Sequence, residues 1–103
     1  MVEKVFMLVS GELIIAQVNE EELSEENKNL FLTTKNANNI VIDHQQHGIA
    51  LVPMGTPLAK NDVKIVKSSI SWLSDPVKEL KNQYVASVSG IITPSSHGLK
   101  LST

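Results

Sequence analysis

Two apolar runs separated by one serine-glycine pair open the sequence, in the stretch MLVSGELIIAQV that covers residues 7–18. Val5–Val9 and Leu13–Val18 are apolar at nearly every position, which is typical of strands that are covered on both faces. Gly11 supplies the backbone freedom that a tight turn between two such strands needs. The stretch therefore predicts an antiparallel pair, either a simple hairpin or the bent first pair of a small closed barrel.

Strand signals continue through the first two thirds of the chain. Leu30–Lys35 reads as a strand that ends at residues 36–39, whose sequence NANN is a strong turn composition. Ile40–Ile42 and Gly48–Val52 are apolar segments that form either a hairpin or one long strand broken by a bulge. Val63–Ile70 alternates in part and predicts the last strand.

An acid-rich insert interrupts these strands at residues 19–29. It holds five glutamates, and its composition predicts a solvated loop with a helical turn that Ser24 starts. An acidic cluster binds a hard cation only when its ligands have a closely specified spacing, so we expect no metal there.

The hydrophobic period changes after residue 74. Asp75 is placed to cap a helix and Pro76 suits the first helical position, while Gly90 is a plausible stop. We expect a helix over about residues 75–89, and over 91–103 either a loosely held tail or a short edge strand. Apolar residues recur at helical spacing at Val77, Leu80, Tyr84 and Val88.

The order of these elements predicts the fold class. A chain of 103 residues is one domain, with strands over about residues 4–72 followed by the helix. Several strands and then one helix indicate a mainly β protein, a compact barrel or sandwich that carries a C-terminal helix.

Composition argues against several classes of function. The net charge is -2 and all nine basic residues are lysines, so the arginine forks that read phosphates and guanine edges are missing. There is no cysteine to form a disulfide or a thiolate metal site. The N-terminal segment does not resemble a secretory signal, and no apolar run reaches membrane-spanning length. These features predict a cytoplasmic protein without a membrane partner.

Residues that carry chemistry are few. His44 and His47, with Asp43 beside them, form the one cluster that resembles a metal site. Zinc needs three or four converging ligands, and residues three apart converge poorly on a strand or loop, so solvated turn histidines are the better interpretation. The serines lack a nucleophile elbow and the glycines stand isolated. We therefore predict no metal, no cofactor and no enzymatic activity.

The aromatic residues are predicted to be structural. Phe6 and Phe31 lie in apolar strands and Tyr84 lies on the apolar helix face, so we expect all three in the core. Trp72 stands between the last strand and the helix, where it either staples the helix to the barrel or anchors an interface.

MLVSGELIIAQV resembles the first motif of Sm-like proteins, in which a turn glycine is followed five positions later by a second small residue. Gly11 matches the first position, and Ala16 stands where the family usually has glycine. Residues 29–32 resemble the family's asparagine-led third strand, and residues 49–55 resemble its fourth strand. That strand normally ends in arginine-glycine, and here Met54 precedes Gly55. The resemblance covers about the first two thirds of the chain.

This resemblance implies a strongly bent, five- to six-stranded open barrel that assembles into a ring, with the fourth strand of one subunit pairing with the fifth of the next. The residues that it places at a subunit interface are Ile49, Leu51, Val63 and Ile65. Single-stranded RNA binding is the family's usual work, and its loops correspond here to Lys28, Asn29 and Gly55. The chain as a whole also resembles small proteins of tailed phages that infect marine cyanobacteria, which implies the host cytoplasm.

Three functions follow as expectations. The first is a non-enzymatic, ring-forming Sm-like scaffold or binding protein of phage origin. The second is a single-stranded RNA chaperone that uses lysines instead of arginine. The third is a structural β-barrel that does not form a ring.

Overall fold

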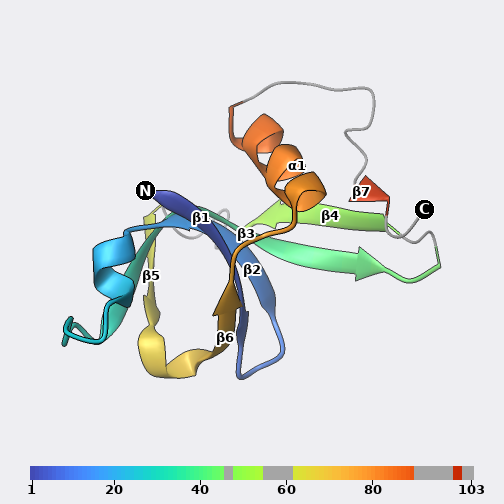
Figure 1. Ribbon diagram of the computed structural model, residues 1–103. Helices are drawn as coiled ribbons and strands as arrows, with labels where there is room; N and C mark the ends of the chain where they lie inside the picture. The colour runs from blue at the N-terminus through green and yellow to red at the C-terminus, as the bar shows by residue number, and fades with distance from the viewer. Residues whose placement is uncertain (46–47, 55–61, 90–98, 101–103) are drawn as a thin grey trace.

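The protein is an open antiparallel sheet that carries one α-helix (Figure 1). A computed structural model describes residues 1–45, 48–54, 62–89 and 99–100. The elements in chain order are β1 (Val2–Leu8), β2 (Leu13–Val18), the 3-10 helix η1 (Glu20–Leu23), β3 (Phe31–Asp43), β4 (Gly48–Pro53), β5 (Asp62–Val66), the 3-10 helix η2 (Lys67–Ser69), β6 (Ile70–Ser74), α1 (Lys78–Val88) and β7 (Leu99–Lys100).

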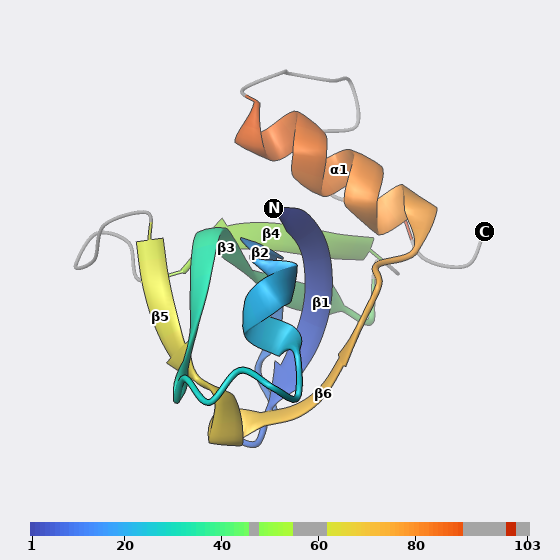
Figure 2. The same cartoon turned by 60° about the vertical axis from the view of Figure 1, so that its left-hand side comes forward.

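The sheet curls into an incomplete barrel. Its strand order is β6-β1-β2-β3-β4-β7, and β5 pairs with the first part of β3. β5 and β6 therefore stand at the two ends of a curled five-strand layer, and η2 joins them without a ladder between them (Figure 2). The expectation of a mainly β, strongly bent open barrel followed by a helix is confirmed.

A bulge at Asn36 bends β3 and changes its partner. Asn36 has a φ of 52°, and the register with β2 shifts between the pairs Ile15–Asn38 and Gln17–Lys35. Before the bulge β3 pairs with β5 over residues 31–35, and after it β3 pairs with β4 over residues 38–43. The predicted turn at residues 36–39 is therefore wrong. Asparagine tolerates the left-handed conformation, and here it produces a bulge inside one long strand instead of a chain reversal.

The opening stretch forms a hairpin that is also the first pair of the open barrel. Gly11 has a φ of 95°, and the turn is closed by bonds from the Leu8 amide to the Glu12 carbonyl at 2.9 Å and from the Gly11 amide to the Leu8 carbonyl at 2.8 Å. Ala16 is fully buried beside the β3 bulge. A small side chain there lets the bulged backbone cross close to β2.

The segment predicted as one strand over Val63–Ile70 is split by η2. The Ser69 hydroxyl donates to the Val66 carbonyl at 2.6 Å, and the Lys67 amide donates to the Leu30 carbonyl at 2.9 Å. This tight turn carries the chain from the edge of β3 to the edge of β1, where β6 pairs. β5 and β6 are therefore two separate edge strands.

Two hydrophobic clusters lie on opposite faces of the sheet. The first fills the barrel and is built around Phe6, Ile14, Ala16, Val18, Leu32, Ala37 and Ile65. The second lies between the outer face of the sheet and α1 and is built around Ile15, Ile49, Leu80 and Tyr84. The predicted burial of Phe6 and Tyr84 is confirmed, because each is fully buried.

The helix starts later than the sequence suggested. Val77 is its N-cap without a side-chain capping bond, and α1 begins at Lys78. Asp75 instead pairs with Lys4 of β1, whose hydrogen bond and positive charge lower the pKa of the carboxyl. The expectation that Asp75 caps the helix is wrong, because this ion pair engages its side chain. Asp75 ties the chain leading into α1 to β1.

The acid-rich insert is attached to the barrel. Asn19 caps η1 by accepting from the Glu21 amide at 3.0 Å, so the turn starts at Asn19 and not at Ser24 as predicted. The Glu22 carboxylate accepts from the Thr33 amide at 2.8 Å and from the Thr33 hydroxyl at 3.2 Å. Leu23 packs against the barrel cluster.

Tyr84 joins the helix to the bulge. Its hydroxyl lies 2.8 Å from the Asn36 carbonyl and 3.3 Å from the Lys35 carbonyl. The Asn36 carbonyl also accepts from the Asn38 side-chain amide at 2.9 Å. Burial raises the pKa of the Tyr84 phenol to about 12, since the anion would lose its hydration.

Alkaline titration tests this environment, because Tyr84 is the one tyrosine in the chain. We expect the phenol absorbance to change with a midpoint near 12 in the folded protein and near 10.0 in denaturant. Because the phenol has a higher pKa in the folded protein, its protonated form contributes to the free energy of unfolding. This contribution is complete below the pKa of the unfolded chain and is lost as the pH rises towards the pKa of the folded protein. Tyr84→Phe should lower the free energy of unfolding by about 1 kcal/mol at neutral pH. A folded-state midpoint near 10.0 would contradict this account of the phenol's burial.

The bulge makes a second prediction, measured by urea denaturation. Asn36→Val places a β-branched residue at positive φ and should cost about 1–2 kcal/mol of unfolding free energy. Asn36→Gly accepts that φ freely and should change stability by less than about 1 kcal/mol, although it loses the 3.3 Å bond to the Gln17 side chain. Equal losses in both variants would show that the backbone conformation is not the constraint.

Candidate functional site

Three strands of the sheet have outer edges that the described residues leave wholly or partly unpaired. β6 pairs with β1 alone and β5 pairs with β3 alone. β4 pairs with β3, and on its other edge β7 covers Gly48 and Ile49 only. Unpaired strand edges present rows of amide and carbonyl groups, which can take up a further strand.

These edges differ in charge. β4 has the sequence GIALVP and β6 has the sequence ISWLS, and neither contains a charged residue. β5 carries the exposed residues Asp62 and Lys64. Charged side chains on an edge discourage pairing with another chain, so β5 is guarded by charge and the edges of β4 and β6 are not.

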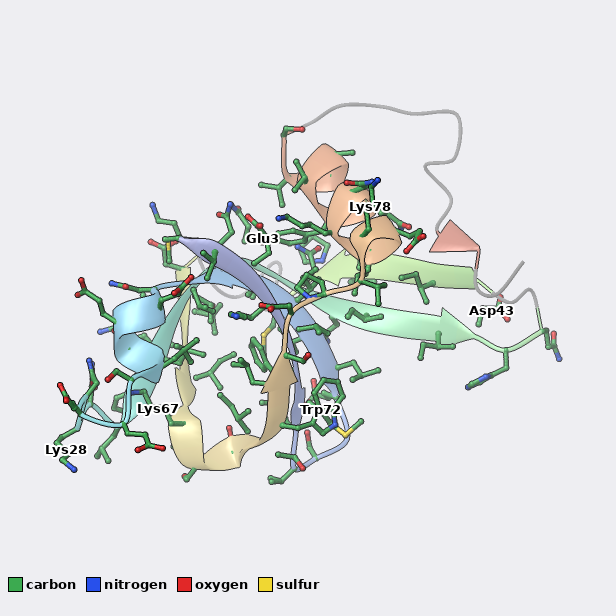
Figure 3. The ribbon with its side chains drawn as sticks, viewed as in Figure 1. Glu3, Lys28, Asp43, Lys67, Trp72 and Lys78 are labelled. Carbon is green, nitrogen blue, oxygen red and sulfur yellow. The ribbon has the colours of Figure 1, made fainter. Side chains whose placement is uncertain are left out.

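Trp72 is the most prominent side chain of the β6 edge. It is 44% exposed and lies opposite Met7, which in turn lies opposite Leu13. Figure 3 places Trp72 well away from α1, and Trp72 does not belong to the cluster beneath the helix. The staple reading is therefore not supported, and Trp72 heads an apolar row across β6, β1 and β2.

The four predicted interface residues have side chains that point into the chain's own clusters. Ile49 is 5% exposed and packs beneath α1, with Leu51 beside it. Ile65 is 5% exposed in the barrel cluster, and Val63 packs against that cluster. At these positions a partner strand would meet the backbone, and the neighbouring residues of β4 that face outward are Ala50 and Val52.

The predicted RNA loop residues are placed in part. Lys28 and Asn29 are exposed, and Asn29 shapes the start of β3, because its side-chain oxygen accepts from the Phe31 amide at 3.2 Å. Gly55 lies outside the described residues.

Phe31 was predicted to be in the core, and this is wrong: it is 43% exposed. It lies opposite Val66 on the outer face of β3 and β5, next to the Thr33–Lys64 pair. The exposure of Phe31 could have been predicted from the alternation of side chains along a strand. Leu32 and Thr34 are fully buried, and Phe31 points to the opposite face. Lys28 and Lys67 lie towards the same end of the barrel (Figure 3).

The histidine cluster gives no metal site in the part of the chain that can be described. Asp43 and His44 are exposed at the tip of the β3–β4 hairpin, and His47 lies outside the described residues. Within the residues that the structure places, no group of three histidine, aspartate or glutamate side chains is arranged to hold a metal ion.

No described helix combines the length and apolar character needed to cross a membrane.

No protein-family model matches the chain, and no curated protein matches it. The Sm-like resemblance therefore remains a prediction.

Proposed function

We propose that the protein is a non-enzymatic scaffold or binding protein that assembles with copies of itself through the edges of β4 and β6. The observation that carries this proposal is the absence of any charged residue from these two strands. They are the first and last strands of the hydrogen-bonded order β6-β1-β2-β3-β4. An unguarded edge is an aggregation hazard unless a partner covers it.

One contact between unlike edges would cover both. If β6 of one copy adds to β4 of the next, each subunit offers one edge to each neighbour, and the contact is heterologous. Such contacts form a ring when the rotation between subunits closes, which is the assembly that the Sm-like resemblance implies. We propose β6 and not β5 for the second edge, because β5 carries the charged residues Asp62 and Lys64.

Trp72 would anchor this contact. Tryptophan is enriched among the residues that contribute most to protein interfaces, since it buries a large rigid surface. Its row with Met7 and Leu13 would extend the contact beyond the backbone pairing. Such an assembly would work in the cytoplasm, that of the host if the chain is encoded by a phage.

Edge charges test the proposal. Native mass measurement and sedimentation should show a multi-subunit species for the wild-type chain. Trp72→Lys and Ala50→Lys each place a charge beside one edge and should raise the midpoint concentration of assembly by at least about tenfold, or about 1.4 kcal/mol. Val85→Lys, on the exposed side of α1, is the matched control and should assemble like wild type. A strict monomer for the wild type would favour a structural barrel without a ring.

A second candidate function is single-stranded RNA binding that uses lysines. The observation in its favour is the exposed Phe31 ring with Lys64 diagonally across the strand pair. Exposed aromatics flanked by basic residues are the stacking platforms of single-strand binders. The exposed loop residues Lys28 and Asn29 precede this strand.

Titration with oligouridine at low and moderate salt examines this candidate. Binding through Phe31 predicts that Phe31→Ala weakens affinity about tenfold, within the range of one lost base stack. Leu30→Ala removes a neighbouring apolar side chain that is 72% exposed and should leave affinity unchanged. No binding by micromolar wild-type protein, even at low salt, would rule the RNA function out.

A further inference from the structure

The outer edge of β4 already carries a short strand from its own chain. β7 pairs with it in antiparallel fashion, so that Gly48 lies opposite Lys100 and Ile49 lies opposite Leu99 (Figure 1). A strand edge presents one row of donors and acceptors, and each position in that row can pair with one strand at a time. β7 and any other incoming strand therefore compete for this part of the edge.

The part of β4 that β7 leaves uncovered is short. β4 has six residues, and its uncovered part is Ala50–Pro53. Pro53 has no amide hydrogen, and the following amide, that of Met54, already donates to the Ala37 carbonyl at 2.8 Å. Strand pairs in proteins usually extend over about five or six residues. A full pairing along β4 consequently needs the positions that β7 occupies.

Resting on the proposed self-assembly, we infer that β7 is an intramolecular cap that competes with β6 of a second copy for the edge of β4. Because β7 belongs to the same chain, its effective concentration at β4 is set by the connecting segment and not by the protein concentration. The cap therefore prevails in dilute solution. Its two residues offer few hydrogen bonds, so the β6 edge of another copy displaces it as the concentration rises.

Truncation separates the cap from the rest of the tail. Deletion of residues 99–103 removes β7, and deletion of residues 101–103 keeps it and is the matched control. A second variant, Leu99→Pro with Lys100→Pro, keeps the chain length and removes both amide hydrogens of β7. The midpoint concentration of assembly is measured by sedimentation over a dilution series, and circular dichroism checks that each variant is folded.

We expect the 99–103 deletion and the double-proline variant to lower the assembly midpoint by about tenfold, which is the equivalent of one or two hydrogen bonds. The 101–103 deletion should keep the wild-type midpoint. Equal midpoints in all folded variants would overturn the cap and leave the self-assembly proposal intact. A monomeric state of every folded variant throughout the dilution series would overturn self-assembly and the cap with it.

Discussion

The contact between Tyr84 and the Asn36 carbonyl is the point on which the architecture depends. Asn36 bends β3 so that one strand can serve both the barrel and the β3–β4 hairpin, and Tyr84 fixes the helix at that bend. The Asn36 carbonyl accepts from both the Tyr84 hydroxyl and the Asn38 side-chain amide, and the buried hydroxyl would lose its hydrogen-bond partners if the bulge were absent. The bulge, the helix and the second hydrophobic cluster are therefore coupled.

This coupling determines where the sheet ends. Because β3 changes partner at the bulge, β4 and β5 share one side of it and neither strand covers the other's outer edge. η2 then takes the chain across to β1, and β6 becomes the second end of the curled sheet. The bulge at Asn36 and the turn at η2 therefore create the edges that we propose for assembly. β4 and β6 are the favoured pair because these two strands carry no charged residue.

The apolar patterns in the sequence predicted the strand content, the helix and the burial of Phe6 and Tyr84, because burial in this fold follows strand and helix periodicity closely. They did not predict the bulge at Asn36, since an asparagine-rich run fits a turn and a bulge equally well. Asp75 was assigned to a helix cap because its ion partner, Lys4, lies 71 positions away in the sequence. The exposure of Phe31 follows from strand alternation and not from its apolar character, because its neighbour Leu32 points into the barrel. The assembly edges needed pairing information, which one sequence does not carry.

The two clusters on opposite faces of the sheet make β2 the most constrained part of the chain. Ile14, Ala16 and Val18 serve the barrel, and Ile15 serves the layer under the helix. Gln17 is the polar exception, and its amide oxygen accepts from Asn36. During sequence divergence, a substitution in β2 would require matching substitutions in the cluster that it contacts. The outward side of α1 faces solvent, so its residues can change more freely. Related chains should therefore be recognised by this short segment long after the helix surface has drifted beyond alignment.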